Sequence, residues 1–173
     1  MLHLGAGLAT VAACMLAETW VSRRHEQVLR GRGAIEPQGD VYALMSLTYP
    51  GGFAVMALEA WSRGRPGLGW VAGGAALFAL AKFLKYAAIA TLGDRWTFKV
   101  LVLPGAPLVR SGPYRWIDHP NYVAVVGELI GAACYFGAAV TGPLVLIGFG
   151  ALIARRVTVE RTALASAAAQ PPR

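Results

Sequence analysis

From Asn121 to Arg156 the chain reads NYVAVVGELIGAACYFGAAVTGPLVLIGFGALIARR. This stretch holds two apolar segments, at about 121–139 and 142–156, which are separated only by the sequence AVTGP at 139–143. A connection this short, with Gly beside Pro, leaves room for a tight turn and little else. The stretch therefore predicts an antiparallel helical hairpin. Because the second segment is shorter than a full membrane span, we expect its helix to continue into the cytosol as far as Glu160.

Three further apolar segments, at about 2–21, 41–61 and 67–85, come close to the roughly 20 residues that a spanning helix needs. The chain has 173 residues, is 56% hydrophobic and has a mean hydropathy of +0.51. A soluble domain of this length does not bury so much apolar surface in one core. We therefore expect one all-α domain over residues 1–173, embedded in the membrane through five transmembrane helices. No basic region precedes the first apolar run, which favours a retained helix over a signal peptide.

The positive charges predict the orientation of the chain in the membrane. Of 16 Lys and Arg residues, all but Arg63 and Arg65 fall on one side of the five expected helices. Positive charge favours the cytosolic side, so we expect an inner or plasma membrane protein with its N-terminus outside and its C-terminus in the cytosol. This arrangement, together with anionic lipid, accounts for the net charge of +7 without a nucleic-acid partner. Cys14 and Cys134 lie in apolar runs without metal-ligand spacing, so neither a disulfide framework nor a metal site is expected.

The longest polar segment, residues 86–120, is expected on the cytosolic side with the other polar segments. Trp96, Phe98, Val100 and Val102 alternate with polar residues, which predicts a short strand or an interfacial ribbon. Aromatic residues in this segment suit the lipid headgroup layer, and on composition alone that interpretation is favoured. The aromatic residues concerned are Trp96, Tyr114 and Trp116.

The sequence SGPYRWIDHPNY at 111–122 adds cations and a His-Pro pair to these aromatic residues. Pro120 suits the first turn of a helix, and the exposed N-terminus of that helix attracts a carboxylate. Neighbouring aromatic faces can hold a cation. The segment therefore indicates a ligand site at the start of a membrane helix.

Residues 112–122 resemble the signature of the isoprenylcysteine carboxyl methyltransferase family and its phospholipid methyltransferase relatives, which read Gly-Pro-Tyr-Arg, two variable residues, usually Arg, then His-Pro-x-Tyr. Residues 156–160 (RVTVE) and Leu164 resemble the family's C-terminal Arg-Ile-x-x-Glu-Glu-x-x-Leu element. The resemblance covers most of the chain, with a catalytic part at about 86–164. It implies a membrane methyltransferase that uses S-adenosylmethionine, and it assigns cofactor binding to Tyr114, His119, Pro120, Tyr122, Arg156 and Glu160.

Two residues depart from the family pattern: Asp118 stands where Arg is usual before His-Pro, and Arg161 replaces the second Glu of the C-terminal element. An Arg would bind a substrate carboxylate through a bidentate fork, whereas an Asp would repel it. Arg115 or Arg110 would have to compensate in an enzyme that acts on carboxylates. An Asp can instead accept a proton from a hydroxyl acceptor. The expected catalytic residues are Asp118, Arg115 and Arg156.

Residues 17–40 resemble the first loop of a bacterial branch of this family, which is linked to type III polyketide synthases. Members of the branch O-methylate alkylpyrones or alkylresorcinols. The fit weakens at 41–43 and at Tyr49, where the branch often has His-Tyr-Pro and His. The resemblance implies a lipophilic, membrane-borne acceptor: an alkylpyrone or alkylresorcinol hydroxyl, or a prenylcysteine-like carboxylate. We expect it to contact Trp96, Asn121 and Glu128.

Ionisable residues inside the apolar segments are costly and therefore informative. Glu128 follows Asn121 by two helical turns, so it either faces the same cavity and helps to place the substrate or forms a neutral hydrogen bond between helices. Lys82 and Lys85 share one helix face and are expected to snorkel to the cytosolic interface.

Two other classes of protein remain as alternatives. A small transporter would place polar groups near the midplane of repeated halves, whereas here they cluster at one interface and no repeat is visible. A non-catalytic membrane scaffold would need no such cluster.

Overall fold

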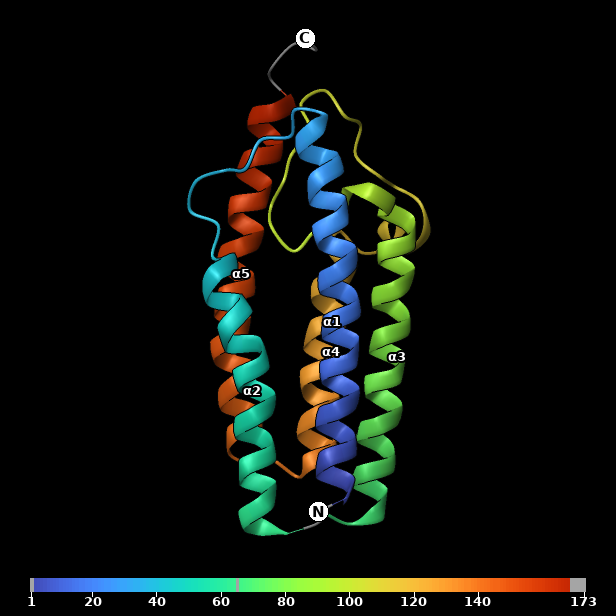
Figure 1. The fold of residues 1–173 in the computed structure, drawn as a ribbon, viewed down its shortest axis with the longest axis vertical. Helices are drawn as coiled ribbons and strands as arrows, with labels where there is room; N and C mark the ends of the chain where they lie inside the picture. Colours follow the sequence, from blue (N-terminus) through green and yellow to red (C-terminus); the bar gives the residue numbers. More distant parts are fainter. Residues whose placement is uncertain (1, 65, 169–173) are drawn as a thin grey trace.

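The computed structural model describes residues 2–64 and 66–168, and this part of the chain forms a bundle of five α-helices (Figure 1). Two short 3-10 helices, η1 (Gly93–Arg95) and η2 (Gly112–Arg115), lie between the third and fourth helices. The predicted all-α fold is confirmed. The five helices are α1 (Leu2–Gly31), α2 (Tyr42–Arg63), α3 (Leu68–Leu92), α4 (Pro120–Phe136) and α5 (Thr141–Ala168).

Within the described ranges, three helical stretches are long and apolar enough to cross a membrane by length and composition: His3–Gly31, Leu68–Arg95 and Thr141–Ala167. α2, with 22 residues, and α4, with 17, are not among them. The outer surface of the bundle nevertheless carries large apolar side chains on four helices. Residues of this kind that are 72–74% exposed include Leu16 on α1, Leu47 on α2, Phe83 on α3 and Ile147 on α5. A bilayer would cover such a surface.

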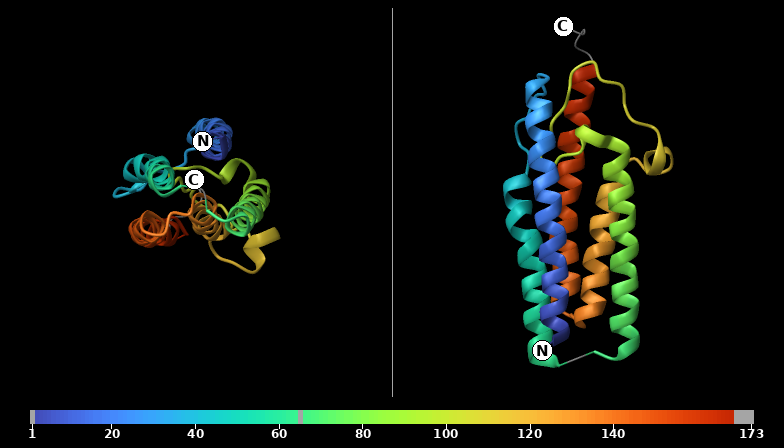
Figure 2. Two further views of the ribbon diagram at one scale, coloured as in Figure 1. Left: turned by 90° about the horizontal axis from the view of Figure 1, so that it is seen from below. Right: turned by 45° about the vertical axis from the view of Figure 1, so that its right-hand side comes forward.

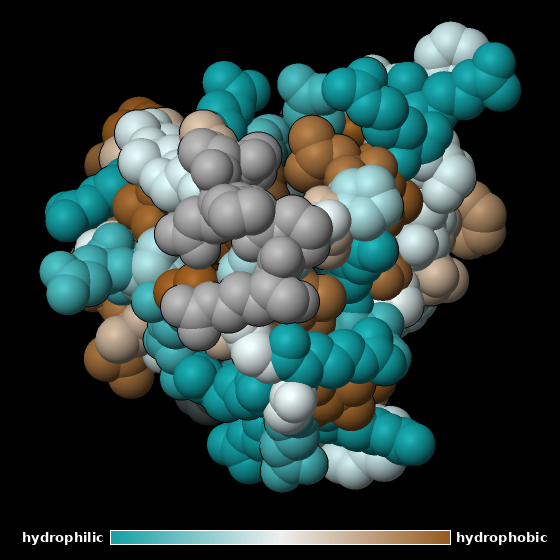
Figure 3. All heavy atoms as spheres, turned by 90° about the horizontal axis from the view of Figure 1, so that it is seen from above, coloured by the Kyte–Doolittle hydropathy of each residue, from teal (hydrophilic) through white to brown (hydrophobic). Residues whose placement is uncertain are grey.

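Several helices run beyond the apolar segments that predict them. α1 ends at Gly31 rather than near residue 21, and α5 continues past Arg156 to Ala168, as expected. These extensions lie at the same end of the bundle as the connections 32–41 and 93–119 (Figures 1 and 2). Seen from that end, much of the visible surface is hydrophilic (Figure 3). The polar segments therefore share one end of the molecule, as the sequence predicts, although two of the cations counted, Arg65 and Arg173, lie outside the described residues.

The predicted hairpin forms between α4 and α5. Gly137 ends α4 in a left-handed conformation, with φ of 69°, which glycine adopts without steric cost. The start of α5 is capped from outside the hairpin, because the Glu59 carboxylate at the end of α2 accepts the backbone N–H groups of Val140 at 3.1 Å and Thr141 at 2.7 Å. A carboxylate at a helix N-terminus satisfies free N–H donors and complements the helix dipole. Glu59 thereby ties α2 to the hairpin.

α4 lies between α3 and α5 and packs closely against α3 (Figure 2). A Cβ atom on Gly74 would lie 2.4 Å from the backbone nitrogen of Tyr135 and 2.6 Å from the carbonyl oxygen of Gly131. A Cβ atom on Gly131 would lie 2.7 Å from the backbone nitrogen of Phe78. The two backbones therefore touch, and small residues at the interface permit this approach in membrane helices.

Replacement of Gly74 by Ala tests this contact. The new methyl group would meet backbone atoms that have no rotamer to escape, so we expect Gly74→Ala to lower the free energy of unfolding by about 1–3 kcal/mol. The matched control is Gly73→Ala, since a Cβ atom there meets nothing within 4 Å. The control should keep its stability or gain up to about 1 kcal/mol from helix propensity. Unfolding by sodium dodecyl sulfate in mixed micelles, followed by circular dichroism, measures both, and equal stabilities would refute the close packing.

Candidate functional site

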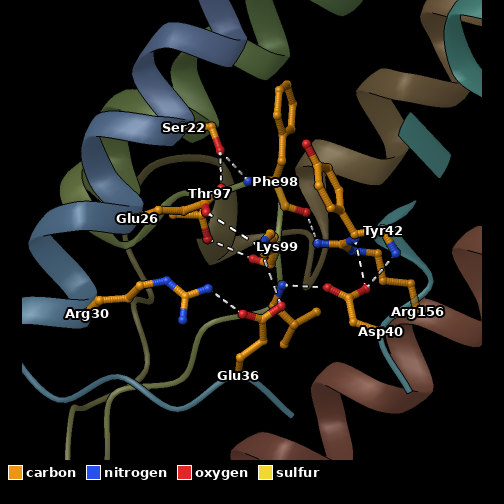
Figure 4. Close-up of polar contacts among 11 residues, drawn as sticks. Ser22, Glu26, Arg30, Glu36, Asp40, Tyr42, Thr97, Phe98, Lys99 and Arg156 are labelled. Atoms are coloured by element: carbon orange, nitrogen blue, oxygen red, sulfur yellow. Dashed lines mark hydrogen bonds and ion pairs between the residues drawn. The ribbon is translucent and has the colours of Figure 1, made fainter. Parts of the chain in front are cut away.

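The segment that follows η1 is held across the polar end of the bundle by hydrogen bonds from two directions (Figure 4). The Ser22 hydroxyl on α1 accepts the backbone N–H of Phe98 at 2.8 Å, and the Asp40 carboxylate accepts that of Val100 at 2.9 Å. Ile35 and Val102 exchange two backbone hydrogen bonds, at 2.8 and 3.0 Å. This isolated antiparallel bridge stands where a short strand was predicted. The contacts explain why α1 extends beyond its apolar segment, because the extension carries part of the support.

A group of ion pairs closes the outer side of this segment. Lys99 Nζ lies 3.7 Å from the Glu36 carboxylate and 4.0 Å from that of Glu26 (Figure 4). Arg30 also pairs with Glu36. The hydrogen bond from Arg30 holds the pKa of Glu36 below its usual range, so this carboxylate stays charged at neutral pH.

Arg156 on α5 is the central cation of the site and is 5% exposed. Its guanidinium donates to the Asp40 carboxylate at 3.1 Å, to the Tyr122 hydroxyl oxygen at 3.0 Å and to the carbonyl oxygen of Phe98. Arg156 thereby joins α5, α4 and two connecting segments. Sequence reasoning missed Asp40, because a buried arginine calls for a carboxylate but the sequence does not say which one.

A cavity of about 400 Å³, here named the polar cavity, lies beside Arg156. The Tyr122 hydroxyl donates to the Glu160 carboxylate at 2.9 Å, and His119 Nδ1 lies 3.9 Å from the same carboxylate. The rings of His119 and Tyr122 are 5.5 Å apart. The cavity wall thus brings together five of the six predicted cofactor residues: Tyr114, His119, Tyr122, Arg156 and Glu160.

The sixth residue, Pro120, is buried at the first position of α4, where the sequence places it. It starts the helix that carries Asn121 and Tyr122. Burial raises the pKa of the Tyr114 hydroxyl, which therefore stays protonated and able to donate a hydrogen bond at neutral pH.

The residues predicted for catalysis and substrate binding lie in different surroundings. Asp118 lines the polar cavity, but its side chain is 88% exposed and lies 3.9 Å from Arg161. Arg115 is exposed and stacks on the ring of Trp116. Trp96 lines the polar cavity and donates to the Asn121 side chain at 3.3 Å. Trp96 is buried within the protein and Trp116 is 80% exposed, so of these two residues only Trp116 has its ring free to contact lipid headgroups.

A second cavity, of about 150 Å³, lies deeper in the bundle and is here named the apolar cavity. Its wall includes charged side chains, among them Glu18 and Lys85, and it takes its name from its apolar residues: Met15, Met45, Pro50, Phe98, Val125 and Phe149. Four residues line both cavities: Thr97, Asn121, Tyr122 and Arg156. These four residues form a shared wall between the two cavities.

A cluster of four buried charges, named here the charge cluster, lies deeper in the bundle than the shared wall, on the side away from the polar end. It consists of Glu18 on α1, Lys82 and Lys85 on α3, and Glu128 on α4. Lys82 Nζ lies 2.6 Å from Glu18 and 3.0 Å from Glu128, and Lys85 Nζ lies 2.8 and 3.2 Å from the same two carboxylates. The expectation that the lysines snorkel to the interface is therefore wrong, because both are buried in ion pairs within the bundle. The apolar segments also hold Glu18 and Glu128, and these possible partners of the two lysines were the available signal.

Glu128, one of the predicted substrate residues, is fully buried and also accepts a hydrogen bond from the Tyr49 hydroxyl. It is not among the residues that line either of the two cavities. Its place is behind the cavity wall, where it pairs with both lysines.

Such a site defines a class of protein: a helical bundle with an apolar exterior in which a polar cavity and an apolar cavity meet at one wall. The chain belongs to the isoprenylcysteine carboxyl methyltransferase family, whose model matches residues 74–166. The matched region contains α4, most of α3 and α5, and the polar cavity's predicted cofactor residues.

Two bacterial relatives match the chain over most of its length. The uncharacterized protein YpbQ of Bacillus subtilis (strain 168) is 33% identical over 148 residues, which cover 86% of this chain and 88% of YpbQ. An uncharacterized protein of Haemophilus influenzae is 26% identical over 165 residues, which cover 95% and 96% of the two chains. No solved structure matches the chain.

Proposed function

We propose that this protein is an S-adenosylmethionine-dependent O-methyltransferase that acts on a lipophilic acceptor delivered from the bilayer. The observation that carries the proposal is the wall that the polar and apolar cavities share at Thr97, Asn121, Tyr122 and Arg156. A reaction between a water-soluble donor and a membrane-borne acceptor needs two such compartments with one point of contact. Family membership supports the methyl donor.

All five helices span the membrane in this proposal, with the polar cavity on the cytosolic side. For α2, support comes from the apolar side chains of Leu44, Leu47 and Leu58, which face outward. The 17 residues of α4 lie at the lower limit for a span. The cytosolic placement follows from the positive charge at the polar end and gives the cavity access to the cytosolic cofactor.

The residues of the polar cavity fit S-adenosylmethionine. Its volume of about 400 Å³ falls within the range of small-molecule sites. Lys99 and Arg110 offer positive charge to a carboxylate, and Glu160 offers negative charge to an ammonium group. The faces of Trp96 and Tyr122 suit a sulfonium cation. When bound, the cofactor supplies a methyl group on a sulfur that is already activated.

The protein's contribution to such a transfer is alignment of the two ligands and exclusion of water. Arg156 fixes the Tyr122 side chain from one side and Glu160 fixes it from the other. Asn121 is held by Trp96. The shared wall is therefore positioned by hydrogen bonds before any ligand arrives.

The apolar cavity supports a single-ring acceptor. An apolar cavity of about 150 Å³ holds a benzene ring in another protein, and this cavity has the same volume. Half-buried Thr19 on α1 and exposed Ser46 on α2 both line it, so it reaches the outer surface between these helices. A ring can occupy the cavity while an alkyl chain remains in lipid. An alkylpyrone or alkylresorcinol hydroxyl fits this description.

A prenylcysteine-like carboxylate is the second candidate acceptor. It needs a cationic partner near the shared wall. Of Arg110 and Arg115, only Arg110 lines the polar cavity, since Arg115 stacks on Trp116. Arg110 would then serve the acceptor while Lys99 serves the cofactor carboxylate. Asp118 at the rim favours the hydroxyl instead, because a carboxylate there can take up the proton that leaves as the oxygen–carbon bond forms.

Cofactor binding is tested by His119→Ala and Glu160→Ala. Glu160→Ala removes the negative charge offered to the ammonium group of the cofactor, and His119→Ala removes the cavity side chain that lies 3.9 Å from this carboxylate, so each should weaken binding of S-adenosylmethionine about 10-fold or more. Arg155→Ala is the control, since Arg155 is exposed on the same helix. Isothermal titration with the detergent-solubilised protein provides the dissociation constants. If both variants bind as the wild type does, the cofactor site lies elsewhere.

The acceptor's reacting group is tested at Asp118. Asp118→Asn keeps the shape of the side chain and removes the base, so turnover of an alkylresorcinol should fall by about 10²- to 10⁴-fold while cofactor affinity changes little. Asp94→Asn, at another exposed carboxylate, is the control. If Asp118→Arg instead raises activity on farnesylcysteine, a carboxylate acceptor replaces the hydroxyl. Full activity of Asp118→Asn on the alkylresorcinol would remove Asp118 from catalysis.

The orientation is tested with single cysteines in a variant that lacks Cys14 and Cys134. Ser62 lies near the end of α2 and Ser111 near η2, and both are exposed. With a membrane-impermeant maleimide, Ser111→Cys should be labelled only from the cytosolic side and Ser62→Cys only from outside. The reverse pattern would place the polar cavity on the wrong side for cytosolic cofactor.

A further inference from the structure

The charge cluster is not explained by the cofactor site. Its members, Glu18, Lys82, Lys85 and Glu128, come from three helices and have exposed fractions of 0–7%. None of them is among the residues that line the polar cavity. Ionisable groups at this depth in a membrane bundle usually face a ligand path or a functional cavity.

Stability alone is a weak reason for such a cluster. Removing four charges from water costs several kcal/mol for each ion, and ion pairing in the interior roughly compensates that cost. Apolar side chains of similar volume would often do as well or better. Because the cluster contributes little net stability, its presence needs another explanation.

The cluster meets the apolar cavity on one side only. Glu18 and Lys85 line this cavity together with Tyr49, whereas Lys82 and Glu128 are not among its lining residues. The Tyr49 hydroxyl donates to Glu128, and Lys85 Nζ lies 5.6 Å from the centre of the Tyr49 ring. Glu18 and Lys85 therefore form a neutral ion pair that borders the cavity, here named the bordering pair. Lys82 and Glu128 form a second neutral ion pair behind it.

The bordering pair has capacity for one more polar group. Lys85 has three N–H donors and contacts two carboxylates, so one donor is spare. Glu18 offers about four lone-pair sites and accepts from two lysines, so about two are spare. A hydroxyl group is the ligand that matches both, because it can donate to Glu18 and accept from Lys85 at once.

We propose that Glu18 and Lys85 bind a second hydroxyl group of the acceptor, so that the protein selects lipophilic rings with two oxygen substituents. One oxygen is presented at the shared wall and the other is held by the bordering pair. The inference rests on the proposed function for the role of the acceptor, but the binding site itself stands on the cavity and the charge cluster. A ligand without the second hydroxyl should bind more weakly, because the spare donor of Lys85 and the spare acceptor sites of Glu18 then lack this partner, while the two side chains stay paired with each other.

The test compares two probes with the same alkyl chain, 5-pentadecylresorcinol and 3-pentadecylphenol, which differ by one hydroxyl group. Equilibrium binding is measured by titration calorimetry on the full chain in lipid nanodiscs, with empty nanodiscs as the blank for partition into lipid. We expect the wild type to bind the resorcinol about 10-fold more tightly or better, as for a hydrogen bond to a charged group. Equal affinities in the wild type would overturn the proposal without any variant.

Two charge-neutral double variants then locate the effect. Glu18→Gln with Lys85→Met removes the bordering pair and leaves Lys82 and Glu128 to pair at 3.0 Å. Lys82→Met with Glu128→Gln removes the pair behind and leaves Glu18 and Lys85 to pair at 2.8 Å. The first variant should lose the preference for the resorcinol. The second removes the same number of buried charges and should lose far less of it.

An equal loss of preference in both variants would show that the cluster acts only through the packing of the bundle, and the proposal would fall. Binding of S-adenosylmethionine, measured on the same samples, checks that the polar cavity is intact. The proposed function fails separately: a wild type that keeps the preference for the resorcinol but transfers no methyl group to it retains the hydroxyl site and is not its methyltransferase.

Discussion

Charge is stable inside a membrane-embedded bundle only when it is paired, and this constraint fixes how α1, α3 and α4 stand relative to one another. Glu18 reaches Lys82 and Lys85 at 2.6 and 2.8 Å. A slide of α1 by one turn, about 5.4 Å, would leave these charges without partners. The backbone contact between Gly74 and Gly131 adds a second requirement, since it is available only where two small residues coincide. Together they specify one register of the three helices.

The register of the bundle in turn determines which side chains meet at its polar end. α4 presents Asn121 and Tyr122 in its first turn, at the level where α5 presents Arg156. Arg156 then reaches the carbonyl of Phe98 and the Asp40 carboxylate, so the connecting segments are held to the helices by side chains rather than by a sheet. A carbonyl and a carboxylate around a nearly buried guanidinium leave that cation few alternative positions.

The sequence predicted the parts of the structure that depend on local pattern. The hairpin at 139–143, the start of α4 at Pro120 and the continuation of α5 past Arg156 all follow from apolar runs, turn residues and helix signals. The motif resemblance also predicted cofactor-binding residues, and five of these six residues line the polar cavity. The pairing of Lys82 and Lys85 with two acids does not follow from the pattern of α3 alone, because the acidic partners come from other helices. For the alternation at 96–102 the sequence allows a short strand or an interfacial ribbon, and in the described part of the chain Val102 forms a single bridge with Ile35 rather than a ladder.

The shared wall also has a thermodynamic consequence. Tyr122 and Arg156 belong to both cavities, so a ligand on one side that shifts either side chain changes the free energy of binding on the other. Linkage makes this effect reciprocal: the factor by which the first ligand alters the affinity for the second equals the factor in the opposite direction. If the two cavities hold the water-soluble and the lipid-soluble ligand of the proposed reaction, their binding free energies are thus coupled through the phenol of Tyr122 and the guanidinium of Arg156.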